Sequence, residues 1–174
     1  LDDGFLEVAE VLGGPVGKVR WHVLPDSLAQ STLTRHQVDN ATHFNGGEGI
    51  WYHHGIIYFV TKGDSRVWMY DIPQQELSII YSSSQYRSPV LTGVDNIIAN
   101  QAGELLIAED GGDMQIVVLV ANKVFPLLQL VGHERSEIAG PALSPDGKRL
   151  YFSSQRGSSG YNDGGITYEV TGPF

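Results

Sequence analysis

The sequence predicts an all-β fold, and within that class a β-propeller built from four-stranded blades. From Gly49 onward, short runs rich in Ile, Val, Tyr, Phe and Trp alternate with turn residues, as β-strands do. Similar turns recur at residues 53–55, 101–103 and 145–147, each ending in glycine, with the glycines 48 and 44 residues apart. That spacing matches one propeller blade. No segment sustains an apolar stripe with helical spacing over three turns.

The expected strands fall into three successive sets. The first set covers residues 50–53, 56–61, 66–71 and 77–81. The second set covers residues 96–100, 104–109, 115–120 and 123–130. The third set covers residues 138–143, 149–154 and 165–171. A β-sandwich would also contain many short strands, but the matching turns favour the propeller.

The first 45 residues do not follow this repeat. Residues 16–24 resemble one strand that ends at Pro25-Asp26, and residues 30–44 are polar, typical of a loop or a single helical turn. We interpret residues 1–45 as the remnant of a preceding blade plus a linker. The remaining chain then holds about three blades, at 46–88, 89–134 and 135–174. Closed propellers have four to eight blades, so we expect either further blades or a second copy to complete the ring.

The composition narrows the functional classes. The formal net charge of −9 argues against nucleic-acid binding, which requires lysine and arginine stripes, and suits cation binding. The absence of cysteine excludes disulfides and thiolate metal sites. No apolar run approaches the roughly 18 residues of a membrane-spanning helix, so we expect no membrane partner.

Oxygen-bearing side chains recur where the innermost strands begin. Glu48, Asn96 and Gly140 each lie seven residues before the glycine of a repeated turn. Asp95 neighbours Asn96, and Glu137 precedes the third innermost strand. Because the innermost strands of a propeller surround one axis, these side chains should converge there. Such an oxygen-rich set suits Ca²⁺, although the same residues also occur in turns that bind nothing.

A second group lies where the second strand of each set ends. Glu109 and Asp110 are consecutive carboxylates before a tight turn, and could bind a divalent cation or act as general acid and base. Lys62 and Arg156 occupy related positions and could hold an anionic oxygen such as that of a phosphate. The alternative is that these are solvated charges of ordinary hairpin turns.

Taken in order, these segments resemble a known family. The motifs are GGEGIWY (46–52), VTKG (60–63), VWMYD (67–71), LTGVDN (91–96), AEDGG (108–112), SEIAGP (136–141), SPDG (144–147) and YFSSQRG (151–157). Together they are similar to the PhoX-type alkaline phosphatases, also grouped as DUF839 proteins. The resemblance covers roughly residues 44–174.

The resemblance implies a six-bladed propeller that is exported by the twin-arginine route to the periplasm or beyond. It implies hydrolysis of a phosphorylated small molecule by a cluster of iron and calcium. Carried onto this sequence, it implies metal ligands at the acidic positions Glu48, Glu109 and Glu137, followed by Asp95, Asn96 and Asp110. Two alternatives remain: a calcium-dependent lactonase of the gluconolactonase or paraoxonase type, and a non-catalytic metal-binding or interaction module.

Overall fold

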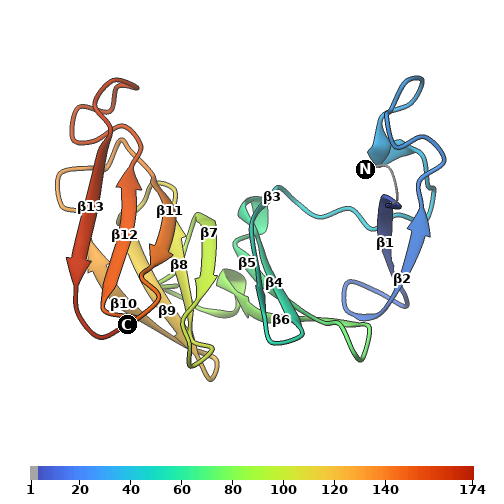
Figure 1. Ribbon diagram of the computed structural model, residues 1–174, viewed down its shortest axis with the longest axis horizontal. Helices are drawn as coiled ribbons and strands as arrows, with labels where there is room; N and C mark the ends of the chain where they lie inside the picture. Colours follow the sequence, from blue (N-terminus) through green and yellow to red (C-terminus); the bar gives the residue numbers. More distant parts are fainter. Residues whose placement is uncertain (1–3) are drawn as a thin grey trace.

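The computed structural model describes residues 4–174, and the all-β prediction is confirmed for this range. Three antiparallel sheets are stacked along the chain, and a separate N-terminal hairpin extends from the first of them (Figure 1). Within residues 4–174 the helical elements are three short 3-10 turns at Thr34–His36, Lys62–Asp64 and Ser83–Gln85. None of the helices between residues 4 and 174 has the length and apolar character needed to cross a membrane.

The first sheet is a four-stranded meander to which the hairpin is attached. Its strands are β3 (Gly47–His53), β4 (Ile56–Thr61), β5 (Arg66–Asp71) and β6 (Glu76–Ser82). The hairpin consists of β1 (Glu7–Val11) and β2 (Gly17–Val23), and β2 pairs with β6 only through Gly17 and Lys18. Strand β2 agrees with the strand expected at 16–24, whereas β1 was not expected.

The second sheet is a complete four-stranded meander. Its strands are β7 (Val94–Ala99), β8 (Leu105–Glu109), β9 (Gln115–Val120) and β10 (Lys123–Gln129), in the spatial order β10-β9-β8-β7. Every residue of β8 is buried, because this strand lies in the middle of the stack and is covered on both faces.

The third sheet has three strands in the described residues, one fewer than a full blade. They are β11 (Ile138–Leu143), β12 (Arg149–Ser154) and β13 (Ile166–Thr171). All eleven strands expected between residues 50 and 171 are found, each within three residues of its expected bounds. The expected remnant at 1–45 includes residues 1–3, which lie outside the described residues.

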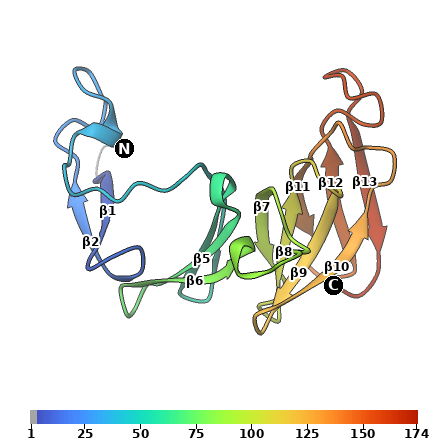
Figure 2. The same ribbon diagram turned by 180° about the vertical axis from the view of Figure 1, so that it is seen from behind.

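Clusters of apolar side chains pack each sheet against the next one along the chain. One cluster, including Val60, Ile97 and Ile107, lies between the first and second sheets, and another, including Leu106 and Phe152, lies between the second and third. Strand β8 contributes to both clusters because its side chains alternate between two buried faces. Seen from behind, the innermost strands β7 and β11 lie next to each other within the stack (Figure 2). This arrangement is propeller-like.

Candidate metal centre

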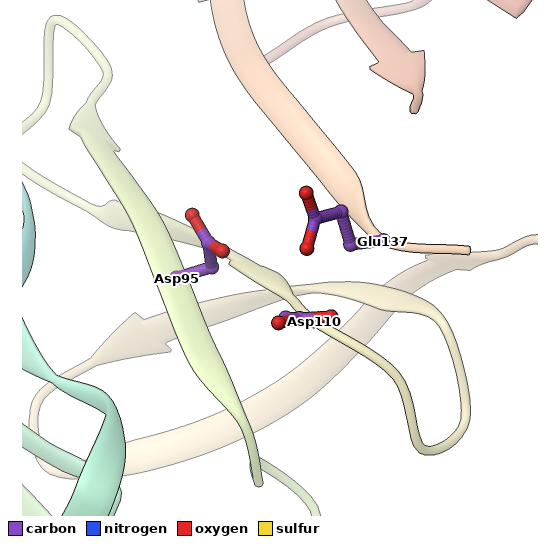
Figure 3. A group of neighbouring side chains, drawn as sticks. All are labelled: Asp95, Asp110 and Glu137. Carbon is purple, nitrogen blue, oxygen red and sulfur yellow. The ribbon is translucent and has the colours of Figure 1, made fainter. Parts of the chain in front are cut away.

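Three carboxylates from three separate segments converge at one end of the stacked sheets. Asp95, Asp110 and Glu137 each offer an oxygen, and these oxygens all lie within 4.8 Å of one another (Figure 3). All three residues are partly buried. We call them the carboxylate cluster. Two oxygens bound to one Ca²⁺ at about 2.3–2.6 Å lie at most about 5 Å apart, so one ion could contact all three carboxylates.

Asp95 owes its position to a bulge in β7. Val94 pairs with Glu109 and Ile97 pairs with Ile107, so Asp95 and the residue after it together oppose a single residue of β8. A bulge bends the strand and redirects its side chains. Strand β3 contains the same irregularity between Gly47 and Ile50. The bulge therefore occurs in both of the first two sheets, once in β3 and once in β7.

The approach of β3 to β7 requires a glycine beside this bulge. A Cβ atom on Gly49 would lie 2.7 Å from the Asp95 carbonyl oxygen and 2.7 Å from the Ile97 nitrogen. Since both are backbone atoms, no side-chain rotation could relieve the clash. Gly49 thus allows the first sheet to lie directly against the backbone that carries Asp95.

Asp110 and Glu137 are positioned by backbone hydrogen bonds at the ends of their strands. The Asp110 amide donates to the Gly93 carbonyl at 2.8 Å, which ties the end of β8 to the residue before β7. The Glu137 carbonyl accepts from the Gln155 amide at 2.9 Å, which ties the start of β11 to the end of β12. Both carboxylates therefore sit on segments that neighbouring strands restrain.

Asn96 links the cluster to the third sheet. Its side-chain nitrogen donates to the Asp95 carboxylate, and its side-chain oxygen accepts from the Gly140 amide at 3.3 Å. Asn96 was expected among the ligands, and the structure places it against one of them. It orients Asp95 as well as adding an amide oxygen to the surroundings.

Two basic side chains border the carboxylate cluster. Lys62 forms an ion pair with Asp110. The Arg156 guanidinium lies 3.9 Å from an Asp110 oxygen and 3.7 Å from a Glu137 oxygen. With three carboxylates and two cations, one negative formal charge remains. The two residues expected to hold an anion therefore lie at the site, although they come from different sheets.

Glu109 and Glu48 lie outside the cluster. Glu109 is fully buried, and its two oxygens accept from the backbone amides of Thr92 at 2.9 Å and Gln115 at 3.1 Å. Burial raises the pKa of the Glu109 carboxyl above its ordinary value, while these two hydrogen bonds oppose that rise. Glu48 is exposed on β3. The structure thus brings together three of the six expected ligands, with Asn96 beside them.

A buried polar group behind Glu137 was missed in the sequence. His133, Ser136 and Ser154 are buried and hydrogen-bonded to one another. Their spacing in the sequence does not predict the contact between His133 and Ser154, because 21 residues separate the two.

An apolar groove of about 580 Å³ lies elsewhere, between the N-terminal hairpin and the first sheet. It is lined by Trp21 of β2, Phe44 of the linker, and Ile57 and Tyr70 of the first sheet. None of the described residues that line the groove is charged, so we place the polar chemistry at the carboxylate cluster instead.

No protein-family model matches the sequence, and no curated protein matches it. Among solved structures, the chain is similar to a luciferin-regenerating enzyme, with 17% sequence identity. The match to that enzyme has a TM-score of 0.57 and covers 96% of this chain and 60% of the enzyme. The second is a protein of unknown function from Bacteroides thetaiotaomicron VPI-5482, with 16% identity and a TM-score of 0.51, covering 68% of this chain and 29% of that protein. The chain thus spans less than two thirds of either structure, and the likeness supports a propeller-like fold.

Proposed function

We propose that the chain is the metal-binding portion of a propeller that hydrolyses phosphate esters. The observation that carries this proposal is the carboxylate cluster bordered by Lys62 and Arg156. Carboxylates alone would suit a structural cation. Two basic side chains at the same place add the groups that a bound phosphate requires.

Each residue has a role in this proposal. Asp95, Asp110 and Glu137 would hold a hard cation, and their all-oxygen donor set fits Ca²⁺. The family resemblance adds iron as a second metal. A bound cation would neutralise the phosphate and polarise it for attack by water. Lys62 and Arg156 would then bind the phosphate oxygens and fix their orientation.

We further propose that three blades of a six-bladed propeller are present, and that other blades or a second copy complete the ring. The apolar groove beside the first sheet and the exposed Ile50 and Tyr52 on β3 support this, because a neighbouring blade would cover such apolar surface. The family resemblance adds a periplasmic or extracellular location to the proposal.

Calcium-dependent lactone hydrolysis is the second candidate. The observation favouring it is the mixed polar lining of the site, because the Asn96 side chain lies beside the carboxylates and donates to Asp95. A lactone is uncharged and would not need Lys62 or Arg156. Dependence of activity on these two residues therefore separates the candidates.

The test uses the purified chain with Ca²⁺, with and without added iron, on p-nitrophenyl phosphate and on a panel of lactones. We expect turnover of the phosphate ester, lost on adding a chelator and in Asp110→Asn. Asp113→Asn is the matched control, because Asp113 is an exposed carboxylate of the same turn that lies outside the cluster. Turnover of lactones alone would replace phosphate with lactone as the substrate class. Turnover of neither substrate, in this chain and in a form with the ring completed, would contradict both.

A further inference from the structure

The buried residues behind Glu137 form a chain of hydrogen bonds that leads to the carboxylate cluster. His133 Nδ1 lies 2.9 Å from Ser154 Oγ, and the Ser154 hydroxyl donates to Ser136 Oγ at 2.9 Å. Ser136 Oγ also accepts from the Arg156 backbone amide at 2.8 Å. The Ser136 hydroxyl proton is directed to the Glu137 carbonyl at 3.4 Å. These hydrogen bonds therefore end on Glu137, which belongs to the cluster, and on Arg156, which borders it.

The number of hydroxyl protons fixes which group donates and which accepts in each of these side-chain hydrogen bonds. A serine hydroxyl has one proton, and that of Ser154 is donated to Ser136. Ser154 Oγ must then accept from His133, so Nδ1 of His133 carries the ring proton. The other ring nitrogen, Nε2, is left to face the Tyr168 hydroxyl at 3.4 Å. The side-chain donors His133, Ser154 and Ser136 thus follow one another from the β13 side toward Glu137.

Burial strengthens these hydrogen bonds. Ser154 is 0% exposed, Ser136 2% and His133 9%, so water does not compete for these bonds. A buried polar group that loses its partner is costly, and the three side chains therefore restrain one another. His133 also packs edge-on against the Tyr168 ring, with centroids 6.2 Å apart.

We propose that His133 is a positioning residue for the carboxylate cluster. In its Nδ1–H form it orders Ser154 and Ser136, and these anchor the backbone of Arg156 and Glu137. This inference rests on the proposed function, because it assigns the anchored residues to cation and phosphate binding. Groups that orient metal ligands from behind typically change metal affinity about 10- to 100-fold when removed.

Two variants of His133 separate hydrogen bonding from packing. His133→Phe fills the space without a donor, whereas the side-chain nitrogen of His133→Asn can replace Nδ1. In His133→Phe we expect amide exchange at Arg156 to accelerate at least about 10-fold and the Ca²⁺ dissociation constant to rise about 10-fold. In His133→Asn we expect both to stay within about three-fold of wild type. Calorimetry supplies the affinity and NMR the exchange rates, each with a melting curve to confirm folding.

The tautomer of His133 tests the proposal without any variant. Long-range ¹⁵N–¹H correlation should show a proton on Nδ1 of the His133 ring and none on Nε2. A proton on Nε2, unchanged exchange at Arg156 in His133→Phe, or equal losses in His133→Phe and His133→Asn would each overturn the proposal. If wild type binds no Ca²⁺, the proposed function fails, and the tautomer and the exchange rates alone decide whether His133 anchors Arg156.

Discussion

Lys62 and Asp110 form an ion pair that joins the end of the first sheet's second strand to the end of the corresponding strand in the second sheet. The pair is informative because Asp110 also belongs to the carboxylate cluster. A cation bound there would share Asp110 with the Lys62 ammonium. Cation binding and the ion pair are therefore coupled, and changes at Lys62 should affect the metal and the substrate in opposite directions.

Replacing Lys62 by methionine should strengthen Ca²⁺ binding and weaken phosphate-ester hydrolysis. Removing a positive charge favours a second cation, and we expect about a five-fold gain in affinity, roughly 1 kcal/mol for a partly exposed charge. The same change removes a phosphate-binding group, so kcat/KM should fall. Calorimetry and initial rates measure the two effects. Lys18→Met is the control, because Lys18 pairs with Glu76 on the surface. Weaker calcium binding in Lys62→Met would contradict the coupling.

Gly49→Ala should destabilise the protein and weaken calcium binding. The added methyl group would meet the backbone of β7 at 2.7 Å, and overpacking of this kind costs roughly 1–3 kcal/mol. Relief of the clash would shift the bulge that carries Asp95. Denaturant unfolding gives the stability, and a calcium titration gives the affinity.

Gly47→Ala is the matched control for Gly49→Ala. It lies in the same strand, where nothing stands within 4 Å of the added Cβ. Its free energy of unfolding should stay within about 0.5 kcal/mol of wild type. Equal stability of the two variants would show that β3 and β7 are not in close contact.

Glu109→Leu should lower stability at neutral pH by roughly 1–3 kcal/mol, because a leucine side chain leaves both buried backbone N–H groups without an acceptor. Chemical denaturation of both proteins at pH 7 measures the difference. A leucine variant as stable as wild type would show that these amides do not depend on the Glu109 side chain.

The pH dependence of this difference has a defined sign. The Glu109 pKa is raised above its ordinary value of 4.5 in the folded protein, mainly by burial. The folded state therefore holds the proton more tightly than the unfolded state does. Its contribution to stability is fully present below the unfolded pKa and is lost as the pH rises through the folded pKa. Wild-type stability relative to Glu109→Leu should thus decrease from about pH 4 upward. An increase over that window would contradict the burial of this carboxyl.

The strands could be predicted because their apolar runs are bounded by turns, as at 115–120 and 149–154, where prediction and structure coincide. Strand β1 was missed because it is only five residues long and includes two glutamates. A sequence cannot show that its alternation is completed by the hairpin partner β2. The third sheet's three strands were also visible in the sequence, although we expected full four-stranded blades.

The carboxylate cluster could be predicted only as a larger set of residues. Asp95, Asp110 and Glu137 were named individually, but their convergence depends on the bulge in β7 and on the stacking of the sheets. Glu109 illustrates the difficulty. Alternation places it on the same face as buried Ile107, yet the whole of β8 is buried, so its pattern does not distinguish the two faces. Only the packed structure shows that Glu109 bonds to backbone amides while Asp110 joins the cluster.

The central claim is that Asp95, Asp110 and Glu137 bind one cation, and calorimetric titration of the purified chain with Ca²⁺ tests it most directly. We predict one binding event per chain, weakened at least about 10-fold in Asp95→Asn, Asp110→Asn and Glu137→Gln. Binding should be unchanged in Asp113→Asn. Absence of binding in wild type, or binding that survives all three substitutions, would contradict the account.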